Sequence, residues 1–276
     1  MLGYRYLLIS LFFVSGMAFA DIYRSVDEHG NVVFSDRSDQ PSAEKIKLQT
    51  GAYRYRVRLK RVIDGDTLEL ESGEKIRLIG INTPEVANRF SDAQPGGVAA
   101  KNWLKTQLRS PELMVEYDQE QYDKYDRRLA HCFLENGDYL NAGLLKAGHA
   151  MLTLTPPNLR YAGPLVAAQT MAEDQGVGIW SLAAYQPKTL ESFTPGSSYR
   201  GWQRWQVTAK AISQGKRVSK LIVSEHLAIQ IANEHLALFE ALEHYIDKPI
   251  EVRGWVSRRG DQHTIKLVHP SAIILL

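Results

Sequence analysis

The fold is decided by residues 62–85, which read VIDGDTLEL over 62–70, ESGE over 71–74 and KIRLIGINTPE over 75–85. Apolar residues dominate both sides of the short ESGE segment, whose glycine and polar residues are typical of a turn. We therefore predict two strands joined by this turn. The first runs over Arg54–Ile63 and continues into Thr67–Leu70, and the second covers Lys75–Ile81.

Charged side chains interrupt both predicted strands, where a purely structural hairpin has no use for them. Asp64 and Asp66 are two positions apart, so on an extended chain both carboxylates point to one side. Arg77 stands in an apolar run, and its guanidinium needs a carboxylate or phosphate partner because burying it alone is costly. Polar groups continue in residues 82–85, Asn-Thr-Pro-Glu. Carboxylates and an arginine on adjacent strands can place a hard cation beside a phosphate.

Three motifs follow one another along the chain: DGDT at 64–67, RLIGINTPE at 77–85 and DKYDRRLA at 123–130. Together they resemble the staphylococcal nuclease (thermonuclease) family, and three motifs in order are far more specific than any one alone. The resemblance covers residues 54–180 and implies a small closed barrel of the oligonucleotide-binding (OB) type. A strand-rich first half with helices laid on it suits the same barrel.

The resemblance implies a calcium site. Asp66 matches the family's calcium carboxylate, Asp64 stands in the surrounding shell, and the main-chain carbonyl of Thr83 is a further ligand. Asn82 stands where the best-known member has a second calcium aspartate. A carboxamide oxygen can still bind Ca2+, but one negative charge is missing, so we expect weaker Ca2+ affinity.

The resemblance also implies the catalytic residues. Glu85 matches the general base that activates or orients the attacking water. Arg77 and Arg127 match the two guanidiniums that clamp the phosphate, with bidentate geometry that lysine cannot reproduce. Tyr125 is expected to line the substrate pocket beside Arg127, with simple packing as the alternative. Asp126 replaces the usual glycine before Arg127, which is expected either to disturb that loop or to pair with the arginine.

One further departure concerns base contacts. The segment 151–158, MLTLTPPN, aligns where the family has tyrosines that stack on the nucleotide base, and it contains no tyrosine. We therefore expect this segment to offer no tyrosine for stacking on a base.

The chain is predicted to be an α+β protein built from several parts. Residues 1–20 combine a positive Arg5, an apolar core and an Ala18-Phe19-Ala20 site, which indicates a signal peptide cut after Ala20. We expect a periplasmic or secreted protein without stable membrane insertion after cleavage; the alternative is an uncleaved N-terminal anchor. The predicted parts are a signal peptide (1–20), a small β-hairpin module (21–49), a staphylococcal-nuclease-like domain (52–182), a linker (183–200) and an OB-like β-barrel domain (201–276).

Helices in the nuclease-like domain are predicted at 98–108, at 141–147 with Asn141 as the cap, and at 158–175. In the C-terminal domain, the apolar residues between 236 and 245 predict a helix between the third and fourth strands. That order of elements is typical of an OB barrel.

The composition sets wide limits. The chain has 276 residues, of which 44% are hydrophobic, and a net charge of +2 that permits an anionic partner without demanding one. The single cysteine, Cys132, excludes an intrachain disulfide and is expected to be a buried small hydrophobe.

These observations predict a Ca2+-dependent endonuclease that cuts DNA and RNA with little sequence specificity and, as the resemblance implies, leaves 3′-phosphate ends. One alternative is a catalytically weak or inactive nucleic-acid-binding protein, marked by Asn82 and Asp126. Another is an envelope adaptor whose flanking modules are the working parts. Glu85, Arg77 and Arg127 favour the enzyme. No feature of the sequence specifies an oligomeric state.

Overall fold

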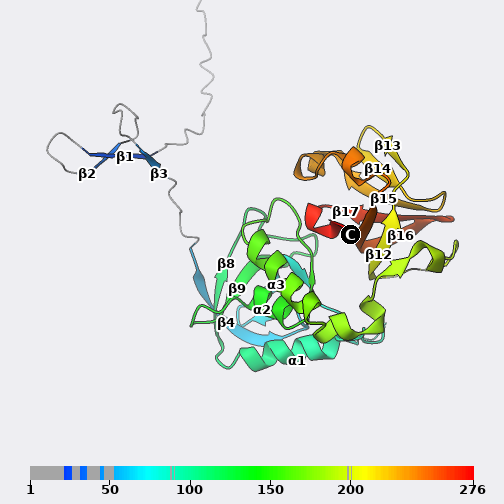
Figure 1. Ribbon diagram of the computed structural model, residues 1–276. Helices are drawn as coiled ribbons and strands as arrows, with labels where there is room; N and C mark the ends of the chain where they lie inside the picture. The colour runs from blue at the N-terminus through cyan, green and yellow to red at the C-terminus, as the bar shows by residue number, and fades with distance from the viewer. Residues whose placement is uncertain are drawn as a thin grey trace, which may run out of the picture. The chain divides into compact units, whose positions relative to one another are not determined.

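The computed structural model describes residues 22–26, 32–35, 44–46, 53–87, 89, 91–197, 199 and 201–276. These residues belong to two separate units, one before and one after the boundary between Ala52 and Tyr53 (Figure 1). The predicted signal peptide lies outside the described residues, so its cleavage stays a prediction. No described helix has the length and apolar character needed to cross a membrane.

The N-terminal unit contains three short strands. Strand β1 (Ile22–Val26) pairs antiparallel with β2 (Val32–Ser35), as the hairpin prediction requires, and the predicted turn between them lies outside the described residues. Strand β3 (Glu44–Ile46) pairs with the other edge of β1, which the sequence did not predict. The order in this sheet is β2-β1-β3.

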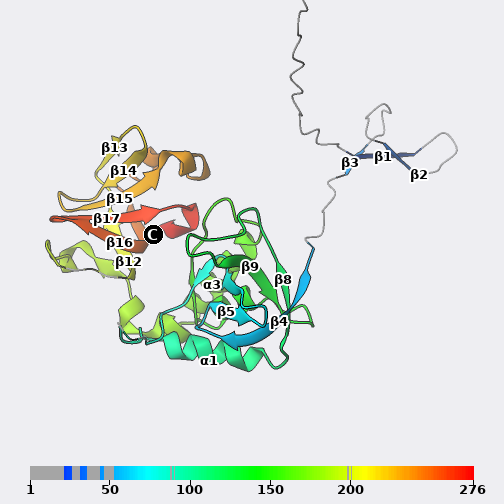
Figure 2. The ribbon, with the colours of Figure 1, turned by 180° about the vertical axis from the view of Figure 1, so that it is seen from behind.

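The second unit begins with a closed five-stranded barrel, in the order β4-β5-β6-β9-β8 (Figures 1 and 2). The pair β6 and β9 is parallel, and the other neighbours are antiparallel. Closure leaves no unpaired sheet edge. The strands are β4 (Tyr55–Val62), β5 (Thr67–Leu70), β6 (Lys75–Leu78), β8 (Glu112–Glu116) and β9 (Arg128–Phe133).

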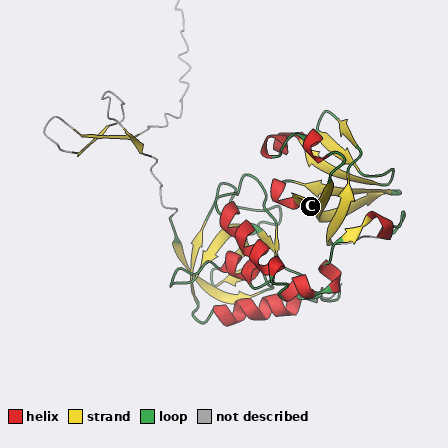
Figure 3. Ribbon diagram, viewed as in Figure 1, coloured by secondary structure: helices red, strands yellow, loops and turns green. Residues whose placement is uncertain are grey.

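Three helices pack against this barrel: α1 (Gly97–Gln107), α2 (Leu140–Lys146) and α3 (Ala162–Asp174) (Figure 3). They match the three predicted helices, although α3 begins later than expected. A short pair, β7 (Ile81–Asn82) with β10 (Met151–Leu152), lies outside the barrel path.

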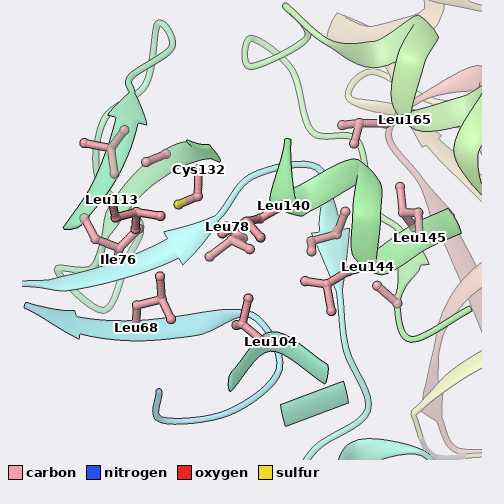
Figure 4. Packing of buried hydrophobic residues seen from close by; sticks show 14 of the residues in the cluster. Leu68, Ile76, Leu78, Leu104, Leu113, Cys132, Leu140, Leu144, Leu145 and Leu165 are labelled. Atoms are coloured by element: carbon pink, nitrogen blue, oxygen red, sulfur yellow. The ribbon is translucent and has the colours of Figure 1, made fainter. Parts of the chain in front are cut away.

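The barrel core is made by apolar side chains that alternate along the strands and recur along the helices. Cys132 is fully buried in this core, as predicted, and burial raises the pKa of its thiol. Figure 4 shows the packing of Leu68, Ile76, Leu78, Leu104, Leu113, Cys132, Leu140, Leu144, Leu145 and Leu165.

Asn141 has a different role from the predicted helix cap. The capping position of α2 is Tyr139, without a side-chain hydrogen bond. The Asn141 side chain is fully buried, accepts a hydrogen bond from the Cys132 amide (3.0 Å) and donates one to the Ile79 carbonyl (2.8 Å). It therefore satisfies two buried main-chain groups of the barrel, and the cap prediction was wrong.

The C-terminal part of this unit forms a second OB-like barrel. The sheet runs β12-β16-β17-β15-β14-β13. Only two residues separate β12 from β13, so these two strands form one bent segment that pairs with β16 at one end and with β14 at the other. The pair β15 and β17 is parallel, as β6 and β9 are in the first barrel. The strands are β12 (Trp202–Thr208), β13 (Ala211–Gln214), β14 (Val218–Ile222), β15 (Leu227–Ala232), β16 (Pro249–Arg259) and β17 (Gln262–Leu267), with β11 (Lys188–Thr189) and β18 (Ile273–Leu275) added at β12 and β16.

The predicted α-helix of the second barrel is instead two 3-10 segments, η4 (Asn233–Leu238) and η5 (Leu242–Tyr245). The apolar residues at 236, 239, 242 and 245 recur every third position, and a 3-10 helix has three residues per turn. The strict spacing of three therefore suits the observed turns better than an α-helix.

The predicted linker at 183–200 contains ordered elements. These are the 3-10 turns η2 (Ala183–Tyr185) and η3 (Leu190–Ser192), together with β11. Tyr185 is buried, and its hydroxyl donates a hydrogen bond to the Pro95 carbonyl at 2.8 Å. The domain boundaries remain predictions.

Candidate active site

The site is organised by Asp66, at the turn where the chain enters β5. Its side chain is 5% exposed. Oδ2 accepts hydrogen bonds from the Thr83 amide (2.7 Å) and lies 3.0 Å from Arg77 Nη2, and Oδ1 accepts from the Thr67 hydroxyl (3.1 Å). A Cβ added at Gly65 would stand 2.6 Å from Thr83 Oγ1, so the glycine of the DGD motif permits this close approach.

Arg77 has the carboxylate partner that the sequence required. It lies on β6 opposite Thr67 of β5, and its guanidinium also donates to the carbonyls of Leu78 (2.8 Å) and Ile81 (2.9 Å). The Arg77 side chain is only 13% exposed. Asp66 and Arg77 therefore fix the reversal of the chain after β6.

Asn82 takes part in this network through both ends of its carboxamide. Its Oδ1 accepts a hydrogen bond from Arg77 Nη2 (2.9 Å), and its Nδ2 donates to the Thr83 carbonyl (3.1 Å). Because a guanidinium can only donate, the carboxamide oxygen must face Arg77. The two oxygens predicted as metal ligands here, Asn82 Oδ1 and the Thr83 carbonyl, are thus both engaged in hydrogen bonds.

Glu85 is exposed and is held by its main chain. Its amide donates to Gln94 Oε1 (3.1 Å), and its carbonyl accepts from the Gln94 amide (2.9 Å). A Cβ on Gly97 would stand 2.3 Å from the same carbonyl, so a glycine is needed where α1 begins. Partial burial raises the pKa of Glu85, and the negative charge of Asp64 raises it further. The positive charges of the arginines at 77 and 127 oppose this shift. Both predicted arginines are therefore near enough for their charges to act on Glu85.

Arg127 is positioned by Asp123, which the sequence analysis did not single out. Asp123 Oδ2 accepts hydrogen bonds from Arg127 Nε and Nη2, each at 2.7 Å, and Oδ1 accepts from the Arg127 amide (3.0 Å). Asp126 has a φ of 59°, a left-handed conformation that aspartate tolerates better than most residues. Asp126 therefore preserves the loop conformation at the position where the family has glycine, and Asp123 forms the salt bridge with Arg127.

Tyr125 lies beside this loop and is 68% exposed. The guanidinium of Arg127 lies 5.4 Å from the centre of its ring. A cleft of about 610 Å³ is lined by Arg77, Arg127 and Tyr125 together with Lys124. The exposed ring supports the pocket-lining interpretation of Tyr125 over core packing.

The donor set fits a hard divalent cation, although it is small. Asp64 and Asp66 provide carboxylate oxygens, the type of ligand that Ca2+ prefers. Burial raises the pKa of Asp66 to about 6, and the charge of Asp64 adds to the shift. A cation beside these carboxylates would relieve their repulsion. Within the described part of the chain, no group of three or more His, Cys, Asp or Glu side chains is arranged to hold a metal, so main-chain or amide oxygens would have to complete the site.

Comparison with known proteins places these residues in a family context. Residues 75–182 match the family described as staphylococcal nuclease homologue, and residues 9–52 match a domain of unknown function, DUF4124. A thermonuclease from Staphylococcus intermedius is 39% identical over 125 residues, which is 44% of this chain and 74% of that protein. A thermonuclease from Staphylococcus hyicus is 35% identical over 44% of this chain and 73% of that protein. Endonuclease YncB from Bacillus subtilis (strain 168) is 33% identical over 47% of this chain and 63% of that protein.

The raised pKa of Asp66 predicts how stability depends on pH without metal. The pKa of about 6 in the folded protein lies above the ordinary aspartate value of 3.8. The folded state therefore binds the proton more tightly, and the contribution is complete below about pH 4 and lost as pH rises through about 6. From pH 4 to pH 7 in EGTA, the free energy of unfolding of wild type is expected to fall by about 2 kcal/mol more than that of Asp66→Asn, which lacks the titrating carboxylate.

Urea denaturation of both proteins between pH 4 and pH 7 measures this difference. Asp92→Asn, at an exposed carboxylate, is the matched control and should follow wild type. Parallel pH profiles for wild type and Asp66→Asn would contradict the prediction.

Proposed function

Because this chain belongs to the family of staphylococcal nuclease homologues, we propose that it is a Ca2+-dependent endonuclease. It hydrolyses phosphodiester bonds of DNA and RNA with little sequence specificity and leaves 3′-phosphate ends. The observation that carries the proposal is the cleft lined by both Arg77 and Arg127, where Arg77 Nη2 lies 3.0 Å from the buried carboxylate of Asp66.

Glu85 has the properties expected of the general base. Its carboxylate is open to solvent, where a water molecule can reach it, and its main chain is held on both sides by Gln94. The raised pKa makes the carboxylate a stronger base than an ordinary glutamate. Glu85 therefore takes the proton of the attacking water.

Arg77 and Arg127 supply fixed positive charge for the phosphate. Arg77 is held by two carbonyls and Asp66, so its guanidinium needs no reorganisation when charge develops on the phosphate oxygens. Arg127 is more open, with 26% of its side chain exposed, and Asp123 fixes its direction. Bidentate contact from a guanidinium orients the phosphate for attack.

Asp66 and Asp64 would hold the calcium ion, with Thr83 and Asn82 providing neutral oxygens. When bound, Ca2+ would add positive charge next to the phosphate oxygens and the attacking water. The Asp66–Arg77 contact supports a calcium position beside the first arginine.

Export is a further part of the proposal. The positive n-region, apolar core and Ala-Phe-Ala site before Asp21 support cleavage after Ala20 and a periplasmic or secreted location. The chain recovered from outside the cytoplasm of an expressing bacterium is expected to begin at Asp21, as intact-mass measurement would show. Full-length chain retained in the membrane fraction would favour the uncleaved anchor instead.

Substitutions at the base and at the more open arginine test the enzymatic proposal. Glu85→Gln keeps the shape of the side chain but removes the base, and Arg127→Lys keeps the charge but removes the bidentate contact. We expect each to lower the rate of single-stranded DNA cleavage by about 10²–10⁴-fold at saturating Ca2+, the range typical of a lost general base or oriented donor. Arg109→Lys, at an exposed arginine outside the site, is the control. EGTA should stop cleavage by the unmodified protein.

Retained cleavage in Glu85→Gln would overturn the assignment of the base. Intact DNA and RNA at every Ca2+ concentration, with salt-dependent binding preserved, would instead identify a nucleic-acid-binding protein without turnover. The hydrogen-bonded carboxamide of Asn82 favours that second candidate.

Asn82→Asp tests why Ca2+ binding is expected to be weak. The substitution adds a negative charge beside Arg77 and Thr83 but loses the hydrogen bond from Nδ2 to the Thr83 carbonyl. Because Ca2+ affinity rises with the number of charged ligands, we expect the Ca2+ concentration for half-maximal cleavage to fall about tenfold. Asp92→Asn, which alters an exposed charge elsewhere, should leave it unchanged. A higher Ca2+ requirement in Asn82→Asp would show that the hydrogen bond matters more than the charge.

A further inference from the structure

One face of the second barrel carries two tryptophans and two arginines. Trp202 of β12 is paired in register with Trp255 of β16, and Arg204 is paired with Arg253. Register partners share a face of a sheet, and so do residues two apart on one strand. The opposite face carries Trp205, which is fully buried in the core of the second barrel. The four side chains therefore lie on the outside of this barrel.

This outer face is anchored to helix α3 of the first barrel. Arg253 Nη1 and Nη2 donate to the two carboxylate oxygens of Glu173 at 2.6 and 2.7 Å, and Arg204 lies 3.7 Å from the same carboxylate. Glu251 accepts hydrogen bonds from the Nε atoms of Arg253 (2.7 Å) and Arg204 (2.8 Å). The Arg253 side chain is only 9% exposed, so the bidentate contact is shielded from solvent.

Aromatic packing supports the same anchor. The ring centres of Trp202 and Trp180, which follows α3 in the chain, lie 6.0 Å apart in an edge-on arrangement. Trp202 also packs against the small buried cluster that contains Met151 and Tyr185. Trp202 is therefore used for packing between the barrels, whereas Trp255 is not accounted for in this way.

Trp255 remains 43% exposed and borders the catalytic cleft. It lines the cleft of about 610 Å³ that contains Arg77, Arg127 and Tyr125. It also lines a neighbouring cleft of about 460 Å³ that contains Glu85. A side chain from the C-terminal barrel thus adjoins both the phosphate-binding arginines and the general base.

The combination of charges and rings points to a particular ligand. Guanidinium groups bind phosphates, whereas exposed indole and phenol rings stack on nucleobases with little sequence preference. Bases inside a duplex are already stacked on their neighbours and cannot present their faces to a ring. We propose that Trp255 is a stacking platform for an unpaired nucleobase of single-stranded nucleic acid whose phosphate lies at Arg77 and Arg127. The C-terminal barrel is thereby part of the substrate site.

This inference rests on the proposed nuclease site, but it is tested by binding as well as by cleavage. Binding is measured in EGTA with Glu85→Gln as the parent protein, using a 12-nucleotide oligothymidylate and the same oligonucleotide with abasic positions. Trp255→Ala is expected to weaken binding to oligothymidylate about tenfold, or about 1.4 kcal/mol, because the stacking of a base on the ring is lost. It should change binding to the abasic oligonucleotide by less than about twofold, since no base is present to stack.

Trp255→Phe keeps an aromatic face and should recover most of the lost affinity. Leu238→Ala removes another exposed apolar side chain of the same barrel, 41% exposed, and should bind like the parent. Thermal unfolding of each variant establishes that the barrel is folded. With Glu85 restored, Trp255→Ala should raise KM for single-stranded DNA about tenfold with kcat nearly unchanged.

Equal loss of affinity for oligothymidylate and the abasic oligonucleotide would overturn the stacking role, as would unchanged binding in Trp255→Ala. Cleavage that does not depend on Trp255 would refute this inference and leave the proposed nuclease intact. Base-dependent binding through Trp255 without any cleavage would do the reverse.

Discussion

The ion pair between Asp66 and Arg77 is the constraint on which the first site depends. Asp66 joins the start of β5 to the amide of Thr83, and Arg77 joins β6 to the carbonyl of Ile81. Both side chains are largely buried, so neither can lose its partner without leaving an uncompensated charge in the protein. The segment that carries Glu85 leaves the barrel in a fixed direction as a result. The same burial raises the pKa of Asp66, because burial disfavours the charged form of its carboxyl group.

The parts of this site that were predictable are those specified by local pattern. The hairpin over 62–78 follows from alternating apolar residues and a turn, and the unpaired arginine in an apolar strand predicted its carboxylate partner correctly. Asp123 was not predicted, although an aspartate four positions before Arg127 with polar residues between them is a signal for a loop closed by its own side chain. Asn82 could be recognised from the sequence as a departure from the family's aspartate. The direction of its carboxamide follows only from its hydrogen bonds in the structure.

Contacts between residues far apart in the chain could not be predicted from the sequence. Trp255 lies far along the chain from Arg77, and nothing in its neighbours distinguishes it from a core residue of an alternating strand. Asn141 resembled a helix cap because it precedes an apolar run, whereas tertiary burial gave it two main-chain partners instead. In residues 236–245, an apolar repeat of 3.0 residues is hard to distinguish from one of 3.6 residues over so few turns. The structure has 3-10 turns here, which have three residues per turn.

The ion pair between Glu173 and Arg253 couples the unfolding of the two barrels. The two barrels have separate cores, but the carboxylate of Glu173 in the first barrel forms a largely buried ion pair with Arg253 of the second. Unfolding of the second barrel would therefore leave Glu173 without this partner. Residues 53–276 are thus coupled energetically as well as covalently, and heat should disrupt them in a single all-or-none transition. A population of molecules with one barrel folded and the other open would be scarce. The cleft between the arginines and the tryptophan is then either fully assembled or absent, and partial degradation of the C-terminal barrel would open this cleft and destabilise the first barrel together.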